Sequence, residues 1–260
     1  MKLYLLVDME GISGISRIEQ VKRHMDGGRA YQQGCRLLAA EINHAVDVCL
    51  DAGATSILVC DTHAAGGNLD PNLAHPAAEY ETPAPDNPMP GLDPSFDGVF
   101  LLGHHGMAGS DGFLEHTYSS AIVFSVTLGG RPIGEIGIEA AWAGGLGVPV
   151  LGVTGDQAAA DEARNWLGDD LPVASVKQAV CRDRARCLGM DAAYKQIERV
   201  IREGVAQRDR EPWTPDLPAE VRWVYCRADQ GPTSSRDGWT RTDPRTACRL
   251  AERPDQLRPI

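Results

Sequence analysis

The first residues of the chain constrain its fold more strongly than any other stretch. Residues 3–7 form an uninterrupted apolar run that leads directly into Asp8, Glu10 and Gly11. A run of this kind is typical of a strand that is buried on both faces, as in a parallel sheet. Because side chains alternate along an extended chain, we expect Asp8 and Glu10 on the same side of the strand end.

Two carboxylates on one side of a strand end repel each other unless a proton or a cation lies between them. A metal ion is the simplest such cation, so this stretch predicts a metal site. The alternative is a solvated Glu10 in a loop and an Asp8 that caps the next turn.

Two more apolar runs and one helical pattern predict the class of fold. Residues 56–60 and 98–103 also have the pattern of buried strands, and apolar side chains recur at helical spacing within residues 29–52. A strand, a helix and a strand in this order form a right-handed βαβ unit with parallel strands. We therefore expect an α/β protein with a mostly parallel sheet flanked by helices.

The second half of the chain carries weaker signals. A Gly-Gly pair between residues 120–128 and 132–136 predicts a hairpin. A change of composition near residue 171 predicts a metal-binding α/β catalytic core in residues 1–170. A smaller C-terminal α/β portion is expected in residues 171–260.

Each of the three apolar runs ends in side chains of the types that bind metals. These side chains are Asp8 and Glu10, Asp61 and His63, and His104 and His105. In an open parallel sheet, ligands bind beyond the carboxyl ends of the strands, so the three segments deliver these groups to one edge. Imidazole and carboxylate suit zinc, iron, manganese or cobalt.

The composition limits the kinds of partner that the protein can bind and the cellular compartment in which we expect it. The net charge of −11 disfavours nucleic acid and favours a cationic ligand such as a free amino terminus. The seven cysteines form no CxxC pair, which indicates free thiols in a reducing compartment. No apolar run approaches the roughly 18–20 residues that a membrane span needs, and the first residues lack the pattern of a secretion signal. We expect a cytoplasmic protein without a membrane partner.

Six short blocks resemble, in order, those of the DppA-like D-aminopeptidases, a family of dinuclear zinc peptidases. The blocks are Val-Asp-Met-Glu-Gly-Ile-Ser-Gly at 7–14, Asp-Thr-His at 61–63, Gly-His-His-Gly at 103–106, Glu-His at 115–116, Arg-Pro-Ile-Gly-Glu-Ile-Gly at 131–137 and Ser-Val-Lys-Gln-Ala at 175–179. The resemblance extends over residues 1–200 and is thin after residue 211.

The resemblance implies five metal ligands and two zinc ions per subunit. By position, Asp8 bridges the two ions. Glu10 and His105 complete one site, and His63 and Glu135 complete the other. A bridging carboxylate suits a two-metal hydrolase, in which the paired ions activate water and stabilise the oxyanion.

Other polar residues have roles that the sequence leaves open. The resemblance makes His116 the catalytic residue, either as a nucleophile or as an acid/base. Neighbouring histidines point to opposite sides of a strand, so at most one of His104 and His105 is expected to bind a metal. The resemblance selects His105, and His104 is then expected to pack or to support a ligand from behind. Asp61 either orients His63 or is itself a metal ligand. Lys177 lies on a predicted buried strand and is expected to contact a substrate carboxylate or an acidic partner.

The leading hypothesis is a metal-dependent aminopeptidase that removes an N-terminal residue, in particular a D-amino acid, from short peptides. A second hypothesis is a zinc-dependent amidase or esterase that acts on small acyl compounds. A third is a scaffold that holds metal without turnover. The resemblance further implies a homo-oligomer, a ring-like decamer with an enclosed cavity that admits small peptides.

Overall fold

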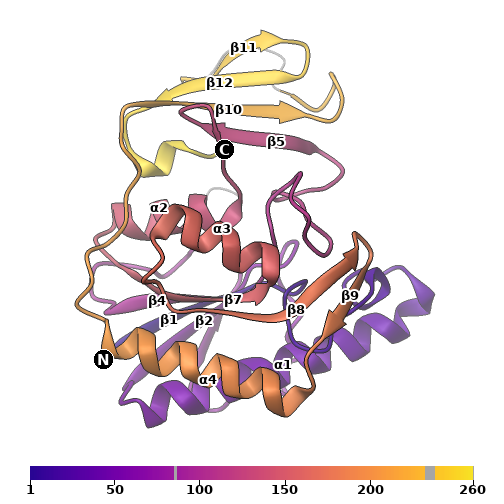
Figure 1. Ribbon diagram of the computed structural model, residues 1–260, viewed down its shortest axis with the longest axis vertical. Coiled ribbons are helices and arrows are strands. Elements are labelled where there is room, and N and C mark those ends of the chain that lie inside the picture. The colour runs from indigo at the N-terminus through magenta and orange to yellow at the C-terminus, as the bar shows by residue number, and fades with distance from the viewer. Residues whose placement is uncertain (85–86, 232–237, 260) are drawn as a thin grey trace.

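The computed structural model describes residues 1–84, 87–231 and 238–259, and within them the chain forms two sheets with helices between and below them (Figure 1). The larger sheet has the strand order β3-β2-β1-β4-β7-β8-β9, and every neighbouring pair is parallel except β8 and β9. Its strands are β1 (Lys2–Val7), β2 (Ser56–Asp61), β3 (Glu79–Glu81), β4 (Gly98–His104), β7 (Val150–Asp156), β8 (Val173–Cys181) and β9 (Arg184–Cys187). The expected α/β class with a mostly parallel sheet is confirmed.

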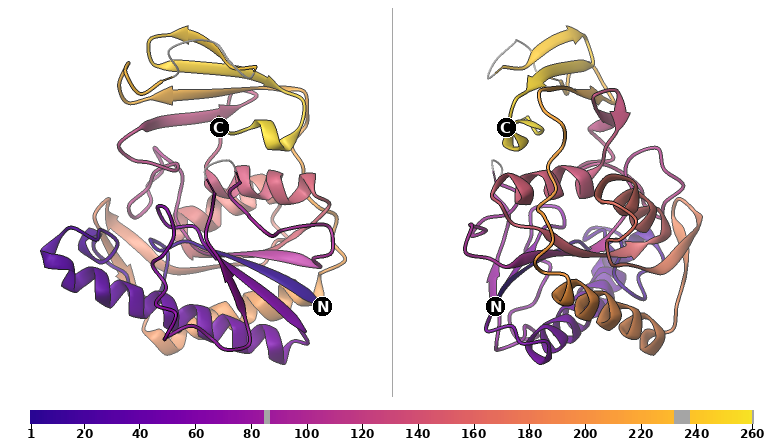
Figure 2. Two further views of the ribbon diagram at one scale, coloured as in Figure 1. Left: turned by 180° about the vertical axis from the view of Figure 1, so that it is seen from behind. Right: turned by 60° about the vertical axis from the view of Figure 1, so that its left-hand side comes forward.

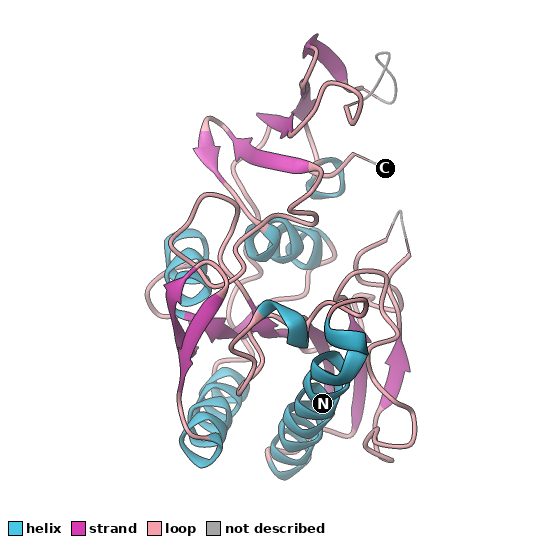
Figure 3. Ribbon diagram, turned by 90° about the vertical axis from the view of Figure 1, so that its right-hand side faces the viewer, coloured by secondary structure: helices cyan, strands magenta, loops and turns pink. Residues whose placement is uncertain are grey.

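Helices cover both faces of the larger sheet, which explains why its central strands are continuous apolar runs. One face carries α1 (Arg29–Asp51) and α4 (Met190–Ala206), which lie side by side, and the other carries α2 (Glu135–Gly145) and α3 (Gln157–Leu167) (Figures 1 and 3). Strands β4 and β7 are buried along their whole length. Among the helices of the described parts of the chain, none has the length and apolar character needed to cross a lipid bilayer.

The smaller sheet is antiparallel and covers the side of α2 that faces away from the larger sheet (Figures 1 and 2). Ile138 of α2 packs with Val221 and Trp223 of the smaller sheet, whereas Ile136 packs toward the larger one. Because it is covered on both sides, α2 is apolar nearly all round. The strands, in the order β11-β12-β10-β5-β6, are β5 (Val123–Leu128), β6 (Arg131–Pro132), β10 (Ala219–Tyr225), β11 (Thr240–Asp243) and β12 (Thr246–Ala251).

The Gly-Gly hairpin is present, but its second strand is shorter than expected. Gly129 and Gly130 have φ values of 57° and 79°, the left-handed conformation of a type I′ turn, and they join β5 to β6. The chain then enters α2, so the prediction of a strand over residues 132–136 is wrong beyond Pro132. Glu135 is the first residue of a helix because the apolar side chains that follow it pack against both sheets.

The two sheets do not divide the chain at residue 171, where the composition predicts a boundary. Strands β5 and β6 already belong to the smaller sheet, and the chain then returns to the larger sheet through β7, β8, β9 and α4 before it forms β10. The polar composition after residue 171 reflects the exposed side of α4, whose buried side includes Ile197, Val200 and Ile201. The smaller sheet is also purely β, apart from a short 3₁₀ turn at Pro254–Gln256 that follows it.

Strand β1 lies at the point where the order of the larger sheet reverses. The chain passes from β1 through α1 to β2 on one side, and β4 pairs with β1 on the other side. Connections that leave in opposite directions open a crevice beyond the carboxyl ends of the two strands. Asp8 follows β1 and His105 follows β4, so both side chains are at this crevice.

A close approach of two backbones fixes the floor of the crevice. The Gly11 amide donates to the Gly103 carbonyl at 2.7 Å. A Cβ atom on Gly11 would lie 2.0 Å from the backbone oxygen of His104, which no rotamer change can relieve. Only glycine allows the loop after β1 to pack against the end of β4 in this way.

We predict that Gly11→Ala lowers the free energy of unfolding by about 1–3 kcal/mol or more, because the added methyl group collides with backbone. The measurement is urea unfolding followed by circular dichroism. Gly189→Ala is a matched control, because Gly189 has φ −62° and ψ 149° and nothing lies within 4 Å of the place that an added methyl group would take. Equal midpoints for the two variants would contradict the role assigned to Gly11.

Candidate metal centre

Six ionisable side chains gather beyond the carboxyl ends of β1, β2 and β4. We call them the six-residue cluster, and they are Asp8, Glu10, His63, His105, His116 and Glu135. All but His116 and Glu135 follow directly on the three central strands, and Glu135 reaches the same place from the first turn of α2. The structure therefore brings together every metal ligand that the resemblance implies, together with the implied catalytic histidine.

Asp8 joins the two halves of the six-residue cluster. The donor atoms of Asp8, Glu10 and His63 lie within 4.8 Å of one another, and so do those of His105, His116 and Glu135. Within this arrangement Asp8 Oδ1 is 3.3 Å from His63 Nδ1, and Asp8 Oδ2 is 3.2 Å from His105 Nε2. One carboxylate thus faces both groups, which is the geometry that a bridging ligand requires.

The grouping differs in one respect from the pairing that the resemblance implies. Glu10 Oε2 is 2.9 Å from Nδ1 of His63, and Glu135 Oε1 is 3.4 Å from Nε2 of His105. The resemblance instead pairs Glu10 with His105 and His63 with Glu135. The strand order separates the two histidines, since β2 and β4 lie on opposite sides of β1.

Backbone carbonyls fix the orientation of the two central imidazoles. His63 Nε2 is 3.1 Å from the Val21 oxygen, and His105 Nδ1 is 2.9 Å from the Gly106 oxygen. A carbonyl oxygen only accepts, so each ring donates an N–H to it and turns its other nitrogen toward the carboxylates. Histidines that bind metals are commonly held in this manner by their second nitrogen.

Burial alone would lower the pKa of His63 and of His105, yet the adjacent carboxylates raise both well above the usual 6.5. Burial would likewise raise the pKa of Asp8, but hydrogen bonds from His105 and His63 hold it well below its ordinary value. Without an ion, the two rings are therefore cations set among carboxylates. A divalent ion supplies the same positive charge, and this set of nitrogen and carboxylate oxygen donors suits zinc.

His116 lies against the cluster with one nitrogen available. Its ring stacks on that of His105, with centroids 4.1 Å apart and planes at 8°. His116 Nδ1 is 2.8 Å from the Leu114 carbonyl and donates to it, which leaves Nε2 for proton exchange. Leu114 and Tyr118 on either side have φ values of 54° and 58°. Strained backbone of this kind is concentrated at functional sites.

Glu162 of α3 holds two loops of the site, although the sequence gives it no role. Its carboxylate accepts the Met107 amide at 2.8 Å and the Gly134 amide at 3.0 Å, and so connects the loop after His105 to the residue before Glu135. Burial raises the pKa of Glu162 to about 7. The sequence does contain one signal for this role, because Glu162 is a carboxylate on the otherwise apolar face of a helix.

His104 is turned away from the six-residue cluster. Its Nε2 is 2.8 Å from Glu139 Oε2 of α2, its Nδ1 is 3.2 Å from the Leu102 carbonyl, and both side chains are buried. His104 is therefore a buried residue that packs against α2, as one of the two expectations stated. Like Glu162, Glu139 is a carboxylate on the apolar face of a helix.

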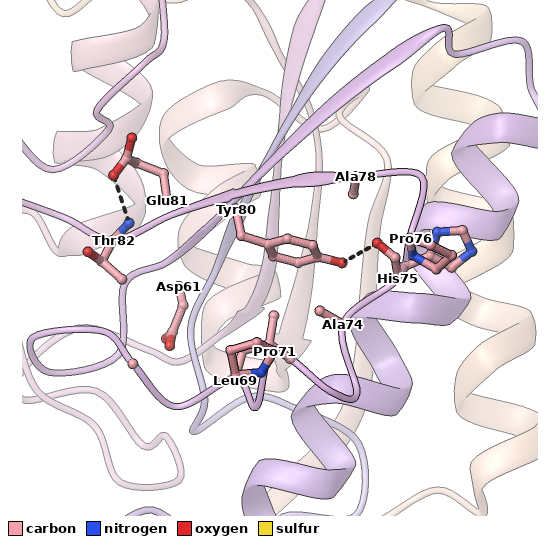
Figure 4. A pocket seen from close by; sticks show the side chains of 11 residues that line it. Asp61, Leu69, Pro71, Ala74, His75, Pro76, Ala78, Tyr80, Glu81 and Thr82 are labelled. Atoms are coloured by element: carbon pink, nitrogen blue, oxygen red, sulfur yellow. Dashed lines mark hydrogen bonds between the residues drawn. The ribbon is translucent and has the colours of Figure 1, made fainter.

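Asp61 supports the segment that carries His63 instead of touching its ring. The Asp61 carboxylate accepts the Asn68 amide at 2.6 Å and the Asn68 side chain at 2.9 Å, and Asn68 Nδ2 also donates to the His63 carbonyl at 2.8 Å. Asp61 borders a separate cavity of about 510 Å³, beside Leu69 and Tyr80 (Figure 4). The sequence gives no indication of Asn68 as the intermediary.

The structure corrects the interpretation of Lys177. Lys177 is 2% exposed, and its ammonium donates to the carbonyls of Glu10, Ile12 and Ile15 at 2.7, 2.6 and 2.7 Å. Burial lowers the pKa of Lys177 to about 8. Three carbonyls occupy the three donors of an ammonium, so Lys177 holds the loop after β1 and has none left for a substrate.

The cluster opens into a cavity of about 320 Å³. Besides members of the cluster, residues from the C-terminal tail and from the loop around residue 120 line it. The polar lining residues include Asp8, Glu10, Lys22, His63, His116, Tyr118, Ser119, Glu135 and Arg258. The sequence singles out neither Tyr118 nor Arg258.

Comparisons with known proteins identify relatives of this chain. The chain is 34% identical over 221 residues to a D-aminopeptidase of Bacillus subtilis (strain 168), across 83% of this chain and 78% of that protein. Its structure is similar to that of the Zn-dependent D-aminopeptidase DppA from Bacillus subtilis, described as a self-compartmentalizing protease. The TM-score is 0.89 and the identity 29%, across 99% of this chain and 94% of that one.

A family model matches almost the whole chain. The model of the D-aminopeptidases covers residues 1–257, which include both sheets and the whole six-residue cluster. The segment after residue 211, where the sequence blocks are thin, is part of that match. The chain belongs to the D-aminopeptidase family.

Proposed function

We propose that this protein is a zinc-dependent aminopeptidase that removes an N-terminal D-amino acid from short peptides. One observation carries the proposal: Asp8 lies between two imidazoles that are each fixed by a backbone carbonyl, at the base of a cavity. The preference for a D-residue is taken from family membership and from the zinc-dependent relative of similar structure.

We propose Asp8, Glu10, His63, His105 and Glu135 as the ligands of two zinc ions in each subunit, with Asp8 shared between them. Their donor atoms and their burial fit such ions, since each group joins carboxylate oxygens to an imidazole nitrogen. When bound, a pair of zinc ions lowers the pKa of water and polarises a peptide carbonyl.

We assign His116 the role of general acid/base. The Leu114 carbonyl keeps a proton on Nδ1, so Nε2 can take up a proton and pass it to the departing amine. Stacking on His105 holds the ring beside the ligands. Tyr118 adds a second constraint, because its amide donates to Glu135 at 2.7 Å and so fixes that carboxylate.

The size of the cavity favours small substrates. Its volume of about 320 Å³ is at the lower end of the range for ligand sites, which suits a dipeptide better than a long chain.

We further propose a homo-oligomer, with the decamer as the specific expectation, in a reducing cytoplasm. Phe124 of β5 and Leu250 of β12 are 63% and 62% exposed on the smaller sheet, and large apolar side chains in such positions mark association surfaces. The structural relative is self-compartmentalizing. All seven cysteines are free thiols, in keeping with a reducing compartment.

The proposal is tested by assaying the purified protein on D-Ala-D-Ala, L-Ala-L-Ala and a simple alkyl ester. We expect hydrolysis of D-Ala-D-Ala, loss of that activity with a chelator, and recovery with zinc. Faster turnover of the ester would favour the amidase or esterase hypothesis. Bound zinc without hydrolysis of any dipeptide would favour the scaffold.

We predict that His116→Ala lowers kcat on D-Ala-D-Ala by roughly 10²–10⁴-fold, the usual contribution of a general acid/base. Zinc content, measured by mass spectrometry, should remain that of the wild type. His24→Ala is the control, because His24 is exposed and does not line the cavity. Loss of zinc from the His116 variant would instead make His116 a metal ligand.

We predict that zinc binding at pH 7 releases about two protons per chain, because His63 and His105 are protonated in the metal-free protein and must lose those protons to bind an ion. Since both pKa values are raised, apparent zinc affinity should increase as the pH rises through neutrality. Calorimetry in buffers of different ionisation enthalpy measures the release. Identical heats in all buffers would contradict the proposed ligands.

A further inference from the structure

We propose that Arg258 binds the free carboxylate of the peptide substrate, so that the enzyme selects short peptides with an unblocked C-terminus. This inference rests on the proposed function and adds the part of the substrate that the metal ligands do not contact. Arg258 lies in the tail after β12, far in sequence from the six-residue cluster.

Arg258 lines the same cavity as Asp8, His63 and His116. The C-terminal tail passes between the smaller sheet and α2, which brings this residue to the site (Figure 1). Among the described residues that line the cavity, the two with permanently cationic side chains are Arg258 and Lys22. Lys22 is exposed, whereas Arg258 is partly buried.

The position of Arg258 is fixed on two sides. The neighbouring Leu257 is 1% exposed, and its carbonyl accepts the Trp223 indole N–H at 2.9 Å. The guanidinium lies over the ring of Tyr118, 4.5 Å from its centroid, and that ring stacks on Trp223. An arginine held by its face on an aromatic ring keeps its N–H edges free for a planar anion.

Tyr118 also connects Arg258 to the metal centre. Its amide donates to Glu135 Oε1 at 2.7 Å, so the residue that supports the guanidinium is bonded to a proposed zinc ligand. The guanidinium of Arg258 therefore has a defined position relative to Glu135, one of the proposed zinc ligands.

The guanidinium lacks an internal counter-charge in the part of the chain that the structure describes. No carboxylate oxygen of those residues lies within 4.0 Å of it, whereas Arg253 in the same tail pairs with Asp255 at 3.0 Å. The three carboxylates of the cavity, Asp8, Glu10 and Glu135, are assigned to the zinc ions. A substrate carboxylate is the anion that enters this cavity with every unblocked peptide, and Arg binds carboxylates through two parallel N–H bonds.

The cavity volume supports the same conclusion. At about 320 Å³ it has room for a dipeptide, whose amino end would lie at the proposed zinc ligands and whose carboxylate would face Arg258. An enzyme that reads both ends of its substrate distinguishes a short peptide from an internal segment of a long chain.

The test compares D-Ala-D-Ala with its C-terminal amide, which has nearly the same shape but replaces the carboxylate by a neutral group. In the wild type we expect a lower KM for the free acid. Arg258→Gln should raise the KM for D-Ala-D-Ala roughly 10- to 100-fold, change kcat little, and leave the amide unaffected. Arg258→Lys should be intermediate, because it keeps the charge and loses the paired bonds. Arg253→Gln is the matched control and should match the wild type.

Equilibrium binding of both peptides in the His116→Ala background tests the inference without turnover. Arg258→Gln should weaken binding of the free acid alone, with zinc content unchanged. Equal losses for acid and amide would reduce Arg258 to a support for Tyr118 and overturn the inference. If binding prefers the acid through Arg258 but no peptide is hydrolysed by the wild type, the proposed function fails while the carboxylate site stands.

Discussion

The carboxylate of Asp8, held between His63 and His105, is the contact on which the rest of the site depends. Three buried carboxylates occupy one end of β1, and they repel one another strongly in a medium of low dielectric constant. The imidazoles compensate them as cations when no metal is bound, and two zinc ions would do so in the proposed enzyme. With or without metal, the positive charge lies at the crevice where the strand order reverses. Its attraction for the carboxylates holds together segments that come from the ends of β1, β2 and β4 and from α2.

A second set of buried charges holds the backbone around that contact. Lys177 ties down the loop after β1, Glu162 connects the segments that carry His105 and Glu135, and Glu41 of α1 accepts the Ser13 amide at 2.8 Å. Each charge is bonded to backbone groups rather than to a charged partner. Such bonds fix the path of a loop whatever its side chains are, and this keeps the ligands in place in a region without regular structure.

The sequence predicts this centre well where the signal is local. The runs before Asp8, Asp61 and His104 identify three strands of a parallel sheet, and their polar ends identify the edge at which the six-residue cluster gathers. His116 and Glu135 came from resemblance alone, since spacing gives neither of them a partner.

The rest depends on contacts between distant segments. A buried lysine in a sequence is compatible with a substrate contact and with hydrogen bonds to backbone carbonyls. The role of Lys177 therefore becomes clear only from the loop whose carbonyls it contacts. Glu162 and Arg258 contact segments far away in the chain, and nothing near them in sequence indicates those partners. Strand pairing also crosses the expected boundary at residue 171, because β5 pairs with β10, which lies almost a hundred residues later.

That long-range pairing affects the order in which the protein can mature. As the chain leaves the ribosome, the larger sheet can assemble as soon as α4 has emerged, but β5 and one side of α2 must wait for β10 and β12. The nascent protein therefore passes through a stage with an exposed apolar helix that a chaperone can recognise. One wall of the cavity also comes late in the chain, because Arg258 follows β12.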